Sequence, residues 1–239
     1  MARAQASKDR DGQAGGDEKR TSLVDDAYAA MRAAIRDASF APGYQASEQE
    51  IALRLGMSRT PVHEAAIRLQ EDGLVRVLPR KGILILALAP DDMREIYDVI
   101  IAMEGRAAEL VAALPDSARL AAAQALETQT DAMAEAHAGG DLQAWGQADG
   151  AFHAALIEHA RNGRMSRIVQ AINDQSHRAR MLTLNLRRGL DASIAEHRRI
   201  AEAVRAGDAA GALDAARQHR IRARDALLPL LSSYGLKHL

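Results

Sequence analysis

One stretch of the chain, from Ser47 to Leu69, constrains the fold more than any other. It predicts two short helices separated by a tight turn at Gly56, because glycine readily takes the left-handed conformation that ends a helix. Ser47 can cap the first of these helices, and Glu50, three residues later, can complete a capping box. The expected apolar contacts of this first helix are Ile51, Leu53 and Leu55.

The second of the two helices is expected to begin after Ser58, which can cap it, with Pro61 in its first turn, where a missing N–H group costs little. Val62, Ala66 and Leu69 then recur on one side at helical spacing. Two helices joined in this way form a helix-turn-helix, whose second helix can lie in the major groove of DNA. A plain pair of antiparallel helices is the alternative interpretation of the same residues.

The segment after these helices has a β-prone pattern. Two apolar runs, Val75–Leu78 and Ile83–Leu86, are joined by Pro79-Arg80-Lys81-Gly82, which predicts a hairpin with a basic tip. Such a tip can reach phosphate groups or the minor groove. A further helix is predicted over residues 22–39, so we expect residues 22–88 to form a winged helix-turn-helix domain of three helices and a β-hairpin.

Composition limits the remaining classes of protein. The 239 residues contain no cysteine, which excludes disulfides and thiolate metal sites and fits a cytoplasmic protein. No apolar run approaches the roughly 20 residues of a membrane span. Residues 1–20 lack the apolar core of a secretory signal and are expected to form a disordered tail.

Charge is local rather than global. The net charge is −1, so the chain is not a general polycation. Six cations nevertheless lie within one short window, and a basic patch of this kind can serve DNA binding, although a solvated surface is the alternative. These cations are Arg54, Arg59, Arg68, Arg76, Arg80 and Lys81.

The second half of the chain contains helical patterns only. Pro90 blocks continuation of the preceding strand, and Asp91 is expected to cap the next helix. Residues 91–231 therefore predict an all-α bundle of six or seven helices, the higher number applying if one helix breaks near Ser176, and the protein is expected to be mainly α. The expected helices cover residues 91–114, 117–138, 141–160, 163–186, 191–206 and 208–231.

Four potential metal ligands stand out in this bundle. Asp149 and His153 are four residues apart and share one helix face, while His197 and His219 lie in the last two expected helices. Side chains that point inward from facing helices are the usual way in which a bundle holds metal. One carboxylate and three imidazoles suit Zn²⁺, Ni²⁺, Mn²⁺ or Fe²⁺. Scattered surface residues are the alternative interpretation.

Residues of the first domain resemble, in order, the N-terminal domain of the GntR family of bacterial transcription regulators. The matching segments are Pro42-Gly43, Ser47-Glu48, Leu55-Gly56, Ser58-Arg59-Thr60-Pro61-Val62 and Asp72-Gly73-Leu74-Val75. The resemblance implies operator binding by a homodimer, with the second helix in the major groove and the tip of the hairpin in the minor groove. The expected DNA-binding residues are Gln49, Ser58, Arg59, Thr60, His63, Arg68, Arg80, Lys81 and Gly82.

Two of these positions depart from the family pattern. The family usually has arginine where Gln49 and His63 stand, whereas Arg59 is retained. Glutamine and a largely neutral histidine can still form hydrogen bonds with bases or phosphates. We therefore expect a shifted sequence preference or weaker phosphate contacts.

The second domain resembles the FCD domain, the ligand-binding domain of FadR-type GntR regulators. The resemblance rests on Met103-Glu104, Asp149-x-x-Phe152-His153, Glu196-His197-x-x-Ile200 and His219. It implies that Asp149, His153, His197 and His219 bind a metal and that a small carboxylate completes the coordination. The family often has an arginine near Ile100 and Ile101, so Arg178 and Arg180 are the expected substitutes for binding the effector.

The sequence therefore predicts a DNA-binding transcriptional regulator, a repressor, whose operator affinity is controlled by a metabolite at or near a metal. The expected partners are double-stranded operator DNA, a small carboxylate and a second copy of the chain. Neither an HExxH motif nor a phosphate-binding glycine loop is present, so an enzyme is not expected. The alternatives are a metal-dependent helical enzyme that carries a DNA-binding domain, and a dimer in which the histidines only add stability.

Overall fold

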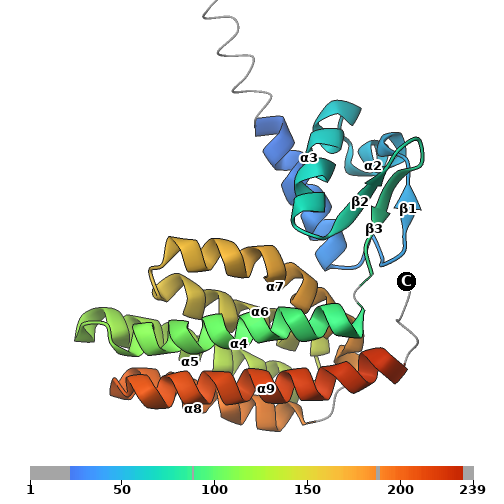
Figure 1. The fold of residues 1–239 in the computed structure, drawn as a ribbon. Coiled ribbons are helices and arrows are strands. Elements are labelled where there is room, and N and C mark those ends of the chain that lie inside the picture. The colour runs from blue at the N-terminus through green and yellow to red at the C-terminus, as the bar shows by residue number, and fades with distance from the viewer. Residues whose placement is uncertain (1–21, 88, 187–188, 234–239) are drawn as a thin grey trace, which may run out of the picture. The chain divides into compact units, whose positions relative to one another are not determined.

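The computed structural model describes residues 22–87, 89–186 and 189–233 (Figure 1). The predicted disordered tail at residues 1–20 lies outside the described residues. The chain divides into two compact units, of which the first ends at Ala87. Each unit is described by itself below.

The first unit is the predicted winged helix-turn-helix. It contains a helix over residues 22–36, followed by α2 (Glu48–Leu55) and α3 (Arg59–Glu71). The predicted hairpin is formed by β2 (Val75–Leu78) and β3 (Gly82–Ile85), and a short strand that was not predicted, β1 (Gln45–Ala46), completes the sheet. The strands are antiparallel in the order β1-β3-β2.

Local chemistry explains most of this unit. The Ser47 side chain caps α2 by accepting from the backbone N–H of Glu50 at 3.1 Å, and Gly56 ends α2 with a φ of 66°. Ser58 precedes α3 but makes no capping hydrogen bond with its side chain. The expected core contact of Leu53 is wrong, because this side chain lies on the outer face of α2 and is 72% exposed. Ile51 on the opposite face is fully buried.

Gly82 determines how closely β1 and β3 approach. It has a φ of 90°, and a Cβ atom at this position would overlap the backbone carbonyl of Ala46. Only glycine satisfies both the backbone conformation and the close approach. The tip that precedes it includes Arg80, which also has a positive φ, of 62°.

The second unit consists of helices, in agreement with the predicted all-α bundle. Its described elements are α4 (Pro90–Ala112), α5 (Asp116–Ala138), α6 (Leu142–His159), α7 (Gly163–Thr183), a 3-10 turn η1 (Leu184–Leu186), α8 (Leu190–Ala206) and α9 (Ala209–Ser233). The helix α4 lies beside α9, and α5 packs against α6 and α8 (Figure 1). None of the helices in the described ranges has the length and apolarity that a bilayer crossing requires.

Two details of this unit differ from the sequence expectations. Asp91 does not cap α4, because the helix begins one residue earlier, at Pro90, and Asp92 accepts from the backbone N–H of Ala89 at 3.3 Å. The helix α7 continues through Ser176, whose side chain is fully buried, and does not break there. A break is instead found after Thr183, where the 3-10 turn begins.

Candidate metal centre and DNA-facing surface

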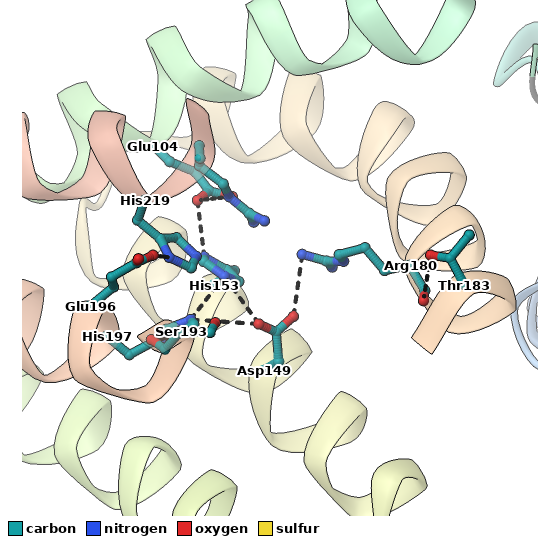
Figure 2. Close-up of polar contacts among 10 residues, drawn as sticks. Glu104, Asp149, His153, Arg180, Thr183, Ser193, Glu196, His197 and His219 are labelled. Carbon is teal, nitrogen blue, oxygen red and sulfur yellow. Dashed lines mark hydrogen bonds and ion pairs between the residues drawn. The ribbon is translucent and has the colours of Figure 1, made fainter. Parts of the chain in front are cut away.

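Three helices of the second unit bring the four predicted metal ligands together (Figure 2). Asp149 and His153 come from α6, His197 from α8 and His219 from α9. One ligand atom from each of the four lies within 4.8 Å of all the others, and all four side chains are buried. The cluster therefore has the residue types, the separation and the enclosure that a metal ion requires.

Each imidazole of the cluster has an oxygen atom beside its Nδ1 atom. Nδ1 of His197 lies 2.8 Å from the carbonyl oxygen of Ser193, and Nδ1 of His219 lies 2.8 Å from Oε2 of Glu196. Nδ1 of His153 lies 2.9 Å from Oε2 of Glu104. Because carbonyl and ionised carboxylate oxygens only accept hydrogen bonds, the proton of each neutral imidazole belongs on Nδ1.

The Nε2 lone pairs are consequently left for the centre of the cluster. Nε2 of His197 lies 3.2 Å from Nε2 of His153 and 3.5 Å from Oδ1 of Asp149. Two unprotonated nitrogens at this distance repel each other unless a cation lies between them. The donor set therefore fits a bound divalent ion, and the oxygen atoms at Nδ1 orient the ligands as metal-bound histidines require.

Burial and neighbouring charges place His197, His219 and Asp149 in their metal-binding protonation states. Desolvation lowers the pKa of His197 and that of His219 well below the usual value, and the neighbouring imidazoles lower both further. For Asp149, burial alone raises the pKa, but Arg180 and His153 lower it by more. At neutral pH, His197 and His219 are thus uncharged and Asp149 is ionised, which are the forms that bind metal.

An ion pair behind the cluster joins three helices. Glu104 of α4 accepts from Nε of Arg220 at 2.6 Å and from its NH2 group at 2.5 Å, and both side chains are buried. The same carboxylate contacts His153 of α6. Burial raises the pKa of Glu104, but the charges of Arg220 and His153 lower it by more, so the carboxylate is ionised. Arg220 belongs to α9.

The two predicted effector-binding arginines are both buried on α7. NH1 of Arg180 lies 3.3 Å from Oδ2 of Asp149, so its charge is adjacent to the cluster (Figure 2). Desolvation lowers the pKa of Arg178 to about 10, although Asp174 partly offsets this effect. Ile100 is fully buried in the apolar core around α4 and α9.

Two cavities reach the histidines from different sides. One, of about 590 Å³, is lined by residues that include Trp145, Glu196, His219 and Arg222. The other, of about 510 Å³, is lined by residues that include His153 and others from α6 and α7. Their volumes are in the range of small-molecule sites, so a metabolite has room beside the cluster.

The first unit presents most of the predicted DNA contacts on one surface hollow of about 450 Å³. Gln49, Arg59 and His63 line it from the helices, and Arg80 and Gly82 line it from the hairpin. Ser58 and Thr60 are exposed at the start of α3, and Lys81 is exposed at the tip of the hairpin.

Arg68, also predicted to bind DNA, does not line this hollow. It lies towards the end of α3, where NH1 contacts Asp25 at 2.6 Å and the guanidinium lies 4.4 Å from the centre of the Tyr28 ring. In the structure Arg68 thus joins α3 to the first helix.

Sequence reasoning missed the acidic residues that orient the arginine and histidine side chains of these two sites. Glu48 contacts Arg59 and His63, Glu104 contacts His153, and Glu196 contacts His219. All three glutamates stand within the motifs that carried the family resemblance, but their partners lie 11 to 49 positions further along the chain. No fixed spacing therefore signals these pairs.

The fold and the two sites define a DNA-binding protein with a helical ligand domain. Residues 23–85 match the model of the bacterial regulatory proteins of the gntR family, and residues 95–222 match the FCD domain. The chain belongs to the GntR family, in the group that carries an FCD domain, and is a transcriptional regulator of that type.

Individual relatives agree with this assignment. An uncharacterized HTH-type transcriptional regulator from the TAR-I ttuE-ttuC' intergenic region of Agrobacterium vitis is 54% identical over 56% of this chain and 78% of its own length. The uncharacterized HTH-type regulator YdhC of Bacillus subtilis is 31% identical over 80% of this chain and 83% of its own. A solved GntR chain from Rhodococcus sp. RHA1 is 24% identical, with a TM-score of 0.72 over 87% of this chain and 98% of that chain, and shows a common fold.

Proposed function

We propose that the protein is a homodimeric repressor whose affinity for operator DNA is controlled by a small carboxylate bound at a metal ion in the FCD domain. The observation that carries this proposal is the buried cluster of Asp149, His153, His197 and His219, with each Nδ1 atom turned towards an oxygen outside it. Without a cation, burial of facing Nε2 lone pairs beside an ionised carboxylate is unfavourable in free energy. The proposed site of action is the cytoplasm.

The four clustered residues would hold the ion, which is Zn²⁺, Ni²⁺, Mn²⁺ or Fe²⁺ by the hardness of this donor set. When bound, it would offer carboxylate oxygens a Lewis-acidic partner. Arg180 would place a positive charge near the ligand, because it already lies 3.3 Å from Asp149. Arg178, two residues earlier on the same helix, is a second buried cation, but the helical repeat places it on nearly the opposite face from Arg180.

In the proposed mechanism the effector shifts a conformational equilibrium. It changes operator affinity only if it binds two arrangements of the dimer with different affinities. The two copies of α3 would enter successive major grooves, about 34 Å apart. An effector that favours another separation would therefore release the operator.

Replacing Arg59 with alanine tests the DNA-binding half of the proposal. The variant is expected to bind more weakly to a duplex selected from a randomised library. The slope of the logarithm of the binding constant against the logarithm of the salt concentration should also become shallower by about 1, because one cation leaves the interface. Titrations of the variant and the wild-type protein at several salt concentrations measure both quantities.

Arg106→Ala is the matched control, since Arg106 is an exposed arginine of the second unit that pairs with Glu109 on the same helix. It should leave affinity and slope unchanged. An Arg59→Ala variant with wild-type affinity and salt slope would refute the assignment of α3 as the recognition helix.

A panel of small mono-, di- and tricarboxylates tests the sensory half. At least one is expected to change the operator affinity of the metal-loaded protein by about 5- to 150-fold, the usual range of allosteric coupling. The response should be lost in Arg180→Met, which keeps the length of the side chain but removes its charge. If every carboxylate leaves DNA affinity unchanged, the protein is a constitutive DNA binder. Consumption of a carboxylate that stops on chelation would instead support the metal-dependent enzyme.

A further inference from the structure

Glu48 holds two side chains of the proposed recognition helix at once. Its Oε2 atom accepts from Nε of Arg59 at 2.8 Å, and its Oε1 atom lies 2.6 Å from Nδ1 of His63. Only 14% of the Glu48 side chain is exposed, compared with 69% for Arg59 and 46% for His63. The carboxylate therefore anchors the inner atoms of both side chains, and their remaining polar atoms stay available to a partner.

The charge state of Glu48 determines which nitrogen of His63 carries the proton. Burial raises the pKa of the Glu48 carboxyl, but the hydrogen bonds from Arg59 and His63, together with their charges, lower it by more. An ionised carboxylate only accepts hydrogen bonds, so Nδ1 of His63 must donate. In a neutral imidazole this leaves Nε2 without a proton, as a hydrogen-bond acceptor.

His63 is well placed for contact with a base. It lies one turn after Arg59, in the first half of α3, which is the part of a recognition helix that meets base edges. Both residues line the hollow that the hairpin bounds with Arg80. The charged residues that line this hollow with His63 are Glu48, Arg59 and Arg80.

We propose that Glu48 is a positioning residue that fixes the tautomer of His63, and that Nε2 of His63 accepts a hydrogen bond from the exocyclic amine of adenine or cytosine in the major groove. Those amines are the hydrogen-bond donors that bases present there. An arginine at position 63 would only donate and would select guanine instead. This inference rests on the proposed operator binding through α3.

The first step of the test locates the base pair that His63 contacts. Wild-type protein and His63→Ala are each used at pH 8 to select duplexes from a library with randomised positions. One base pair in each half-site is expected to lose its enrichment in the variant, while the other positions keep theirs. If no position responds to His63→Ala, His63 does not read a base and the inference is wrong.

The second step identifies the atom that is read. Duplexes are made in which the base at that position lacks either its exocyclic amine or, for a purine, N7. Loss of the amine should weaken wild-type binding by about 3- to 10-fold, the value of one hydrogen bond, and should leave His63→Ala unaffected. Loss of N7 should have no effect. Weakening by the loss of N7 instead would mean that Nε2 donates, which would overturn the tautomer assignment.

Three Glu48 and Glu50 variants test the positioning role. Glu48→Ala should bind duplexes with and without the exocyclic amine equally well. Glu48→Gln should still bind the duplex that lacks the amine more weakly, because its amide oxygen can accept from Nδ1 of His63. Glu50→Ala is the matched control, since Glu50 lies on the same helix but its carboxylate accepts from Tyr44 at 2.9 Å. If Glu48→Ala loses as much affinity as the wild-type protein when the amine is removed, Glu48 does not position His63. If the wild-type protein enriches no sequence at all, the proposed operator binding fails before this inference is reached.

Discussion

Replacing both His197 and His219 with alanine is expected to abolish metal binding in the helical unit. Two of the four donors are then lost, and the remaining pair, Asp149 and His153, comes from a single helix and offers too few ligands for a stable site. Elemental analysis of protein purified with a divalent metal should give about one ion per wild-type chain and none for the variant. Addition of metal should raise the melting temperature of the wild-type protein only, because an ion stabilises a fold only when the folded state binds it.

His159→Ala is the matched control for this experiment. His159 is a half-buried residue at the end of α6, the helix that provides Asp149 and His153, but it is not part of the cluster. Its replacement should leave metal content and the metal-dependent rise in melting temperature unchanged. Because removal of two buried imidazoles can itself destabilise the fold, His219→Gln provides a variant of similar volume. Full metal occupancy in the double variant would mean that the ion binds elsewhere.

Replacing Glu104 with alanine is expected to lower the free energy of unfolding by about 3–5 kcal/mol. The change leaves Arg220 buried without its hydrogen-bonded carboxylate, and a buried charge that has lost its partner costs far more than the intact pair contributes. It also removes the carboxylate at Nδ1 of His153, so metal affinity should fall by about 10- to 100-fold. Denaturant unfolding and a metal titration measure the two effects separately.

A half-buried glutamate on the same helix provides the comparison. Glu109 pairs with Arg106 at 2.6 Å near the surface of α4, and Glu109→Ala should cost only about 0.5 kcal/mol. The double replacement of Glu104 and Arg220 by leucine should be less destabilising than Glu104→Ala alone, since neither charge is then left unpaired. If Glu104→Ala and Glu109→Ala lower the free energy of unfolding equally, the buried pair does not have the predicted stabilising role.

The fold was largely predictable because its signals are local. Gly56, Pro79 and the two short β-prone runs at residues 75–78 and 83–86 mark turns and strands within a few residues. The two-residue strand β1 was not predictable in this way, since it exists only through pairing with β3, almost forty residues later. Leu53 was wrongly expected in the core because an apolar residue in a short helix does not itself reveal which face is buried.

The candidate metal centre was predictable in its residues but not in its surroundings. Asp149 and His153 have a helical spacing that marks a shared face, His197 and His219 lie in the last two expected helices, and the family resemblance supported all four as ligands. Glu104 and Glu196, which contact two of the imidazoles, lie on other helices than His153 and His219 and are far from them in sequence. Packing of the bundle creates these contacts, so a single sequence carries no periodic signal for them.

The continuity of α4 has a mechanical consequence for a regulator of this type. The helix begins at Pro90, just after the first unit ends at Ala87, and continues without interruption past Glu104. With a rise of 1.5 Å per residue, Glu104 lies about 21 Å along the helix axis from Pro90. Because the helix is unbroken and Glu104 contacts His153, a rotation or shift of α4 at Glu104 would also displace the start of the helix. The chain enters α4 at that end from the DNA-binding unit, so such a displacement would act where the two units are covalently joined.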